Sequence, residues 1–149
     1  MGQCIAVVSG KGGTGKTSFT AGVGAALALS GLRVLCVDCD IGLRNLDIAL
    51  GLSDAALMDF SDVAQQRCTL ERAVVSHPQL AKLSLLTAPI RQRGQPVTGE
   101  QMASLLRAVR IQYDFCLLDA PAGLGDGFLL ATAAADRCVV VTTADASSL

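Results

Sequence analysis

The sequence S-G-K-G-G-T-G-K-T-S, at Ser9–Ser18, lies between a short apolar run, Cys4–Val8, and an alanine-, glycine- and leucine-rich segment of helical character. It contains the phosphate-binding loop pattern G-x-x-x-x-G-K-[ST], whose fixed positions are filled by Gly10, Gly15, Lys16 and Thr17. In such a loop the backbone N–H groups turn inward around an anion, and the following helix adds the positive end of its dipole. The stretch therefore predicts a phosphate site. The alternative, a glycine-rich turn that binds nothing, is disfavoured because a strand precedes the loop and a helix follows it.

Each residue type in this loop has a role in binding a nucleotide. Glycines allow the required backbone angles and a close approach to the phosphates. The Lys16 ammonium places a point charge on the outer phosphates, and the Thr17 hydroxyl can ligate Mg²⁺. The predicted nucleotide-binding residues are Gly10, Lys11, Gly12, Gly13, Thr14, Gly15, Lys16, Thr17 and Ser18.

Composition restricts the class of protein. The 149 residues are enough for one domain, and 51% of them are hydrophobic, which provides a sizeable core. A net charge of -1 gives no electrostatic reason to expect nucleic acid or an anionic membrane as a partner. Aromatic residues are only 3% of the chain, which disfavours a base-stacking surface. No leader-like segment or membrane-spanning run is apparent, and we expect a cytoplasmic protein.

The six cysteines do not suggest a disulfide framework. Four of them lie in apolar runs and are expected to be small buried side chains: Cys4, Cys36, Cys116 and Cys138. Cys36 and Cys39 form a C-x-x-C pattern, but on a strand that spacing places the two side chains on opposite faces. We therefore expect neither a metal site nor a disulfide from this pair.

Apolar runs alternate with helical segments along the whole chain, which predicts an α/β fold with a mostly parallel sheet and helices on both faces. Five strands are predicted, over Cys4–Ser9, Arg33–Asp38, Leu83–Ala88, Phe115–Asp119 and Cys138–Thr142. Helices are predicted over Thr17–Ser30, Asp59–Arg67, Leu70–Val75, Gly99–Ile111 and part of Leu124–Ala135. Thr69 and Thr98 are candidate helix caps, and Ile41–Leu52 is interpreted as a loop. We expect residues 1–149 to form one domain.

Acidic residues follow two of the predicted strands, at the edge where open α/β sheets place their ligand sites. Asp38 and Asp40 end one strand, and Asp119 ends another. Asp119 is the acidic counterpart that a phosphate loop requires to hold Mg²⁺ or its water. By the same strand-end reasoning, residues 145–148 lie on the ligand side. His77, Arg91 and Arg93 are instead interpreted as surface residues.

Three segments resemble the MinD/ParA family of deviant Walker A ATPases. The loop has two lysines, Lys11 and Lys16, in K-G-G-T-G-K-T, which is similar to the deviant Walker A motif. Asp38–Asp47, D-C-D-I-G-L-R-N-L-D, resembles switch I of the MinD branch of that family. Asp119–Gly123, D-A-P-A-G, is similar to its switch II. The similarity runs through essentially the whole chain.

The resemblance implies an ATPase that binds ATP and Mg²⁺ and dimerises face to face around two ATP molecules. Lys11, Lys16 and Asp40 would be catalytic: Lys11 reaching the partner's nucleotide, Lys16 on the phosphates and Asp40 orienting the attacking water. The implied metal ligands, direct or through water, are Thr17, Asp38, Asp40 and Asp119. The implied role is placement of the division septum, with regulators of the MinC and MinE type as partners.

The family is also longer than this chain. Its later part includes adenine recognition and a C-terminal amphipathic membrane helix, so we expect the present residues to be the N-terminal portion of the fold without that anchor. Two other functions stay open: a ParA-type partition ATPase, and a non-catalytic module whose nucleotide shapes loops for a protein partner. Iron–sulfur reductases of the superfamily are disfavoured because Ala122–Phe128 contains no cysteine.

Overall fold

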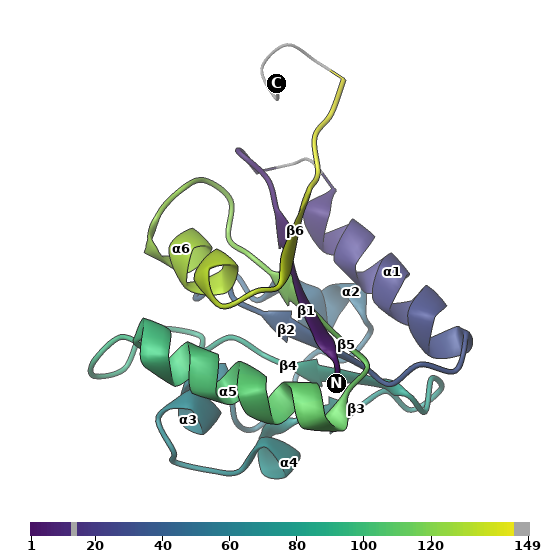
Figure 1. Cartoon of the computed structure of the whole chain (residues 1–149), viewed down its shortest axis with the longest axis horizontal. Coiled ribbons are helices and arrows are strands. Elements are labelled where there is room, and N and C mark those ends of the chain that lie inside the picture. Colours follow the sequence, from purple (N-terminus) through teal and green to yellow (C-terminus); the bar gives the residue numbers. More distant parts are fainter. Residues whose placement is uncertain (13–14, 145–149) are drawn as a thin grey trace.

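A computed structural model describes residues 1–12 and 15–144, so Gly13, Thr14 and the predicted ligand-side segment 145–148 lie outside the described residues. The described part contains a six-stranded sheet in the order β3-β4-β2-β5-β1-β6 (Figure 1). All neighbouring strands are parallel except β3 and β4, which are antiparallel. The strands are β1 (Gln3–Val8), β2 (Val34–Asp38), β3 (Val75–Ser76), β4 (Leu83–Leu86), β5 (Phe115–Asp119) and β6 (Arg137–Val140).

Helices cover both faces of this sheet, as predicted (Figure 1). One face is covered by α1 (Lys16–Leu29) and α2 (Asn45–Ala49). The opposite face is covered by α3 (Phe60–Ala64), α4 (Leu70–Ala73), α5 (Gly99–Gln112) and α6 (Asp126–Ala133). The α/β fold with a mostly parallel sheet is thereby confirmed. All five predicted strands are present, with ends within two residues of those expected.

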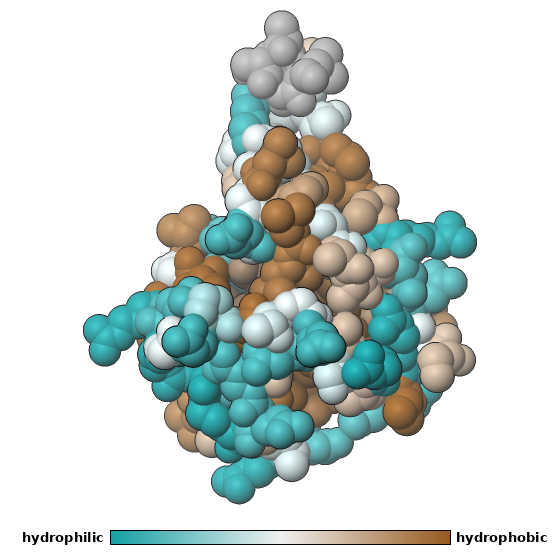
Figure 2. Space-filling view, turned by 60° about the vertical axis from the view of Figure 1, so that its left-hand side comes forward, coloured by the Kyte–Doolittle hydropathy of each residue, from teal (hydrophilic) through white to brown (hydrophobic). Residues whose placement is uncertain are grey.

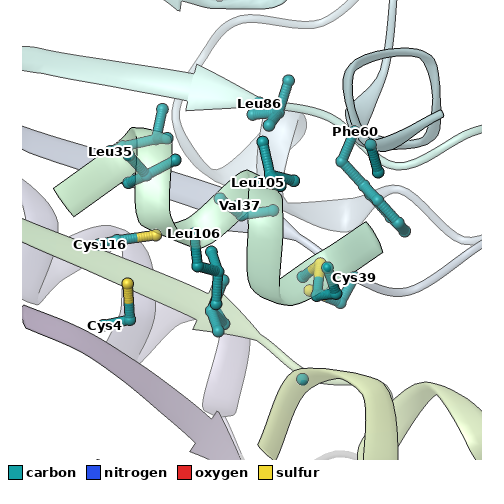
Figure 3. Packing of buried hydrophobic residues seen from close by; sticks show 14 of the residues in the cluster. Cys4, Leu35, Val37, Cys39, Phe60, Leu86, Leu105, Leu106 and Cys116 are labelled. Carbon is teal, nitrogen blue, oxygen red and sulfur yellow. The ribbon is translucent and has the colours of Figure 1, made fainter. Parts of the chain in front are cut away.

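Two apolar clusters fill the layers on either side of the sheet. Cys4, Leu35 and Cys116 belong to the cluster beneath α3–α6, which Figure 3 shows at close range. Cys36 belongs to the opposite cluster beneath α1, while Cys39 packs with the first cluster, so the C-x-x-C pair does point to opposite faces.

Cys138 is exposed, contrary to the prediction that it would be buried. It lies on β6, which within the described residues pairs only with β1 and forms one edge of the sheet. Figure 2 shows apolar side chains at the surface around α6 and β6, the elements that carry the exposed Leu129 and Val140. The apolar run thus identified the strand correctly, but an edge strand leaves Cys138 exposed.

Two elements were not predicted. The segment expected to be a loop contains α2, which begins after Arg44 takes a left-handed conformation (φ 48°) and which buries Leu46 beneath the sheet. The predicted helix from Leu70 ends at Ala73, and the following residues form β3 beside β4. That pairing continues into the hydrogen bond from His77 N–H to Leu83 O (2.9 Å).

Helix α5 begins with the predicted cap. Thr98 Oγ1 accepts a hydrogen bond from Gln101 N–H (3.1 Å), and Gln101 Oε1 accepts one from Thr98 N–H (3.0 Å), which makes a capping box. Thr69 occupies the equivalent position before α4, but its hydroxyl makes no capping hydrogen bond there.

Through residues 1–12 and 15–144, none of the helices is both long enough and apolar enough to span a lipid bilayer.

Candidate phosphate-binding site

The predicted phosphate loop and two of the acidic residues meet where parallel strands end together. Strand β5 lies between β1 and β2, and its last residue, Asp119, is in register with Val7 of β1 and Asp38 of β2. A pocket of about 330 Å³ opens beside these strand ends. Its lining includes Gly12, Gly15, Lys16, Thr17, Ser18 and Asp40. Residues separated by more than 100 positions are thus brought to one place.

Lys16 and Thr17 each contact Asp119 directly. The Lys16 ammonium forms an ion pair with Asp119 Oδ1, and the Thr17 hydroxyl donates a hydrogen bond to Asp119 Oδ2 (2.9 Å). Both members of the ion pair are almost completely buried. Because a buried charge requires a partner, removing either group would leave the other unpaired in the interior.

The backbone fixes Lys16 and Thr17 at the first turn of α1. Gly15 is the N-cap residue and has a φ of 83°, a left-handed conformation that glycine adopts without strain. One helical turn after Lys16, the Thr20 hydroxyl donates to Lys16 O (2.9 Å) and lies 3.5 Å from Asp119 Oδ1. The N-terminal part of α1 therefore supplies three side chains that lie against Asp119, those of Lys16, Thr17 and Thr20.

Asp38 has a different environment from Asp119. Its Oδ1 accepts a hydrogen bond from Asp40 N–H (2.9 Å), and its Oδ2 accepts one from Leu46 N–H (3.3 Å). The pKa of Asp38 is raised to about 6, chiefly by burial and also by the neighbouring Asp119 and Asp40 charges, while the two hydrogen bonds act in the opposite direction. Asp38 thus connects the end of β2 to the first turn of α2.

Asp40 lines the phosphate pocket and is half-buried. Partial burial raises its pKa; Lys16 acts in the opposite direction, and Asp119 adds to the increase. The Asp40 carboxylate thus lies at the same pocket as the Lys16 side chain and interacts with its positive charge.

The oxygen atoms suited to Mg²⁺ are divided between two places. Thr17 and Asp119 contact each other, whereas the Asp38 carboxylate is engaged by backbone N–H groups. In the part of the chain that the structure describes, no three His, Cys, Asp or Glu side chains converge as a metal site. Mg²⁺ commonly binds through one or two carboxylates together with waters and phosphates, so the hydroxyl and carboxylate oxygens of Thr17 and Asp119 suit it chemically.

The other predicted loop residues have mixed placements. Gly12 and Ser18 line the pocket, while Gly10 and Lys11 are not among its lining residues. Lys11 is partly buried, and its carbonyl oxygen accepts a hydrogen bond from the Ser9 hydroxyl (2.9 Å).

Several residues that the sequence analysis did not select also belong to the site. Leu43, Asn45 and Ala122 line the pocket, and Thr20 approaches Asp119. Thr20 could have been found, because position i+4 from Lys16 lies on the same helix face. Leu43 and Asn45 lie within the Asp38–Asp47 segment that resembles switch I, but their position at the pocket depends on how the segment before α2 turns.

Two of the residues interpreted as surface residues have structural contacts. His77 Nδ1 accepts hydrogen bonds from Gln79 N–H (3.1 Å) and Leu80 N–H (3.2 Å), so in a neutral ring Nε2 donates to Leu50 O (3.1 Å). His77 therefore connects the end of α2 to the β3–β4 connection. Arg93 remains about half exposed and pairs with two acidic side chains around the start of α3.

Comparison with known proteins finds similar chains along the whole length of this one. Residues 2–149 match a family model described as an AAA domain. The chain is 41% identical over 149 residues to the septum site-determining protein MinD of Synechocystis sp., and 39% identical over 151 residues to MinD of Bacillus subtilis. Each match covers the whole of this chain and 56% of the relative.

Solved structures show the same similarity. MinD in the MinC:MinD cell division protein complex of Aquifex aeolicus superposes with a TM-score of 0.88 at 38% identity, covering 98% of this chain and 58% of that chain. MinD of Pyrococcus horikoshii, complexed with Mg-ADP, gives a TM-score of 0.84 at 31% identity, covering 99% of this chain and 60% of that one. The chain therefore spans somewhat more than half the length of the proteins it matches. With its two-lysine phosphate loop, it belongs to the MinD/ParA family of deviant Walker A ATPases.

Proposed function

We propose that this chain binds ATP with Mg²⁺ and acts as a MinD-like nucleotide switch in placing the division septum, with residues 1–149 forming the N-terminal portion of the ATPase domain. The observation that carries the proposal is the buried contact of Lys16 and Thr17 with Asp119 at the ends of β1 and β5. A lysine and a hydroxyl on the first turn of a helix, facing a strand-end carboxylate, are the groups that phosphate-loop enzymes use on phosphates and metal.

Nucleotide binding would rearrange the charges of this contact. Lys16 would exchange Asp119 for the outer phosphates, leaving the carboxylate for the cation. Thr17 and Asp119 would hold Mg²⁺, with Asp38 and Asp40 acting through water, and the cation would supply positive charge to the phosphate oxygens. The Pyrococcus relative is described as a complex with Mg-ADP, which supports the same ligands here.

Hydrolysis would use two further residues. Asp40, already facing the pocket, would orient the attacking water. Lys11 would reach the nucleotide of a second copy in a homodimer and stabilise transition-state charge, as an arginine finger does. The Aquifex relative is described in a complex with MinC, which supports a regulator of that type as a partner.

The test compares ATP binding with turnover. Isothermal titration with MgATP should show binding that Lys16→Ala abolishes, because no other ammonium lines the described pocket. Phosphate release should be lost in Lys11→Ala and slowed in Asp40→Ala while both variants retain ATP affinity. Lys82→Ala is the matched control, since Lys82 is exposed and contacts Gly31 O (2.9 Å). Unchanged ATP affinity in Lys16→Ala contradicts the site assignment.

A second candidate is a non-catalytic module in which nucleotide holds the switch segment in shape for a protein partner. It is favoured by one observation: Asp38 uses both carboxylate oxygens to fix Asp40 and Leu46. ATP binding without phosphate release, unaffected by Lys11→Ala, would support the module instead of the enzyme. The ParA-type alternative requires DNA binding, which a net charge of -1 does not favour.

A further inference from the structure

A second pocket, of about 440 Å³, lies outside the phosphate site, between the segment before α2, the segment before α3 and the β4–α5 connection. Three arginines, Arg44, Arg91 and Arg93, contribute to its lining, and we call it the arginine pocket. Apolar side chains complete the lining, among them Leu57 and Ile90, which are 97% and 70% exposed. Its volume is in the range of pockets that take small molecules.

Arg44 is held in this lining in an unusual way. Its backbone is left-handed, with φ 48° and ψ 53°, a conformation that costs energy for a residue other than glycine. The side chain is four-fifths buried, and its nearest acidic partner, Asp47 Oδ2, is 3.7 Å from the terminal nitrogen. Within the described residues, the buried Nε–H has no hydrogen-bond partner. A buried guanidinium N–H of this kind is a donor that an anion can satisfy.

Among the residues that the structure describes, two of the three arginines of the pocket have acidic partners, and the third does not. Asp59 is the carboxylate in the lining, and it accepts hydrogen bonds from Arg93 (3.2 Å) and from Ser61 N–H (2.9 Å). Arg93 also bonds Asp62 (3.1 Å), so its charge is balanced. Arg91 is exposed and forms no ion pair within the described part of the chain. Arg91 therefore provides positive charge without an acidic partner in the described residues, and Arg44, paired with Asp47 at 3.7 Å, keeps an unsatisfied Nε–H donor beside an apolar surface.

The arginine pocket and the phosphate pocket share a wall. Leu43 and Asn45 line the phosphate pocket, while Arg44, between them, lines the arginine pocket. Leu46, the next residue, is bonded to Asp38 at the phosphate site (3.3 Å). A ligand that binds Arg44 and shifts its position therefore also shifts the adjacent residues, which contact the phosphate site.

We propose that the arginine pocket binds a small organic anion, a carboxylate or phosphate with an apolar body, and that this anion and the nucleotide change each other's affinity. The anionic group contacts Arg44 and Arg91, and the apolar body packs on Leu57 and Ile90. Coupling follows from the shared wall and is reciprocal by thermodynamic necessity. The coupling rests on the proposed nucleotide site, whereas the anion site does not.

Binding is tested with four probes on the full chain: hexyl phosphate, hexanoate, uncharged 1-hexanol and inorganic phosphate. The hexyl anions should bind, detected by NMR shift changes or calorimetry, and the better of the two identifies the anionic group. Hexanol and inorganic phosphate should bind at least about tenfold more weakly, because hexanol lacks the anionic group and inorganic phosphate lacks the apolar body. Equal binding of hexanol and the hexyl anions overturns the proposal.

Variants separate this pocket from the phosphate loop, which could itself attract hexyl phosphate. Arg44→Gln and Arg91→Gln should each weaken binding of the hexyl anion about tenfold. Lys16→Ala should leave it unchanged, and so should Arg107→Gln, the control at an exposed arginine on α5. Arg91 is exposed, so its variant remains informative if Arg44→Gln fails to fold. Binding lost in Lys16→Ala and retained in Arg91→Gln overturns the site.

Coupling is measured as the change in hexyl-anion affinity when MgADP is added to saturation. A shift of about threefold or more, absent in Arg44→Gln, is expected. An unchanged affinity in the presence of bound MgADP overturns the coupling. Failure of MgADP to bind at all would instead count against the proposed function, and the anion titrations without nucleotide would still decide the anion site.

Discussion

The Lys16–Asp119 ion pair shows how a single buried contact serves two states of the site. Both groups are shielded from water, so neither can lose its partner without leaving an uncompensated charge in the interior. In the proposed function the nucleotide provides the replacement partner for Lys16. The same contact therefore contributes to the stability of the chain without nucleotide and must open when phosphate binds.

This contact predicts a non-additive effect on stability. Lys16→Met should lower the free energy of unfolding by about 3 kcal/mol, because it leaves the Asp119 carboxylate buried and unpaired. Adding Asp119→Asn should recover much of that loss, since the remaining group is neutral. Urea denaturation of the two single variants and the double variant measures the coupling. Lys82→Met, at an exposed lysine, is the control, and strictly additive single losses would contradict the buried pairing.

Asp38 predicts a pH dependence of stability. Its pKa of about 6 in the folded chain lies above the ordinary value of 3.8, so the folded state binds the proton more tightly. The resulting stabilisation is complete below about pH 4 and is lost as the pH rises through 6, a difference of about 3 kcal/mol. Asp38→Asn removes this pH-dependent stabilisation. The stability of the variant relative to the unsubstituted chain should therefore increase from pH 4 to pH 8. A pH-independent difference between the two proteins, measured by urea denaturation, would refute the prediction.

At the scale of elements, α1 approaches the sheet closely at Gly24. A Cβ added at Gly24 would lie 2.7 Å from Cys36 Sγ and 3.4 Å from Leu83 Cδ1, and Cys36 is a short, fully buried side chain. At Gly22, on the same helix, an added Cβ meets nothing within 4 Å. The glycine at position 24 thus sets the helix–sheet distance and the one at position 22 does not.

The two glycines make a matched pair of tests. Gly24→Ala should destabilise the chain by about 1–3 kcal/mol, because overpacking forces α1 away from the sheet and moves the phosphate loop at its start. Gly22→Ala should stabilise it by about 0.5–1 kcal/mol, because alanine is the better helix former. Thermal and urea unfolding give both values. Equal effects of the two substitutions would show that the space beside residue 24 does not limit how closely α1 packs on the sheet.

The elements that could be predicted from sequence are those with local signals. The phosphate loop has a fixed residue pattern, and α5 has a cap followed by apolar residues at helical spacing. The short elements α2 and β3 lack such signals. Helix α2 exists because Leu46 is buried and Arg44 reverses the chain, and β3 exists because β4 offers an edge to pair with. Their formation depends on distant parts of the chain, which local propensity does not contain.

At the scale of the molecule, sequence predicted the class of the sheet but not its order. Apolar runs identified β1, β5 and β6 as strands, but nothing in them says that β1 lies between the other two. The contact between Lys16 and Asp119 depends on that order, because it requires β5 beside β1. The candidate site was therefore predictable as a set of residues through the family motifs, while its geometry and the arginine pocket required the structure.

The position of β1 also has a consequence for synthesis of the chain. Both strands that border β1 lie more than 100 residues later, at Phe115–Asp119 and Arg137–Val140. Asp136 closes the arrangement, since it accepts a hydrogen bond from Cys4 N–H (2.8 Å) and its own N–H donates to Cys4 O (2.7 Å). During translation, β1 thus leaves the ribosome before either of the strands that border it. Until those strands emerge, this apolar segment lacks its partners, and the contact between Lys16 and Asp119 cannot form.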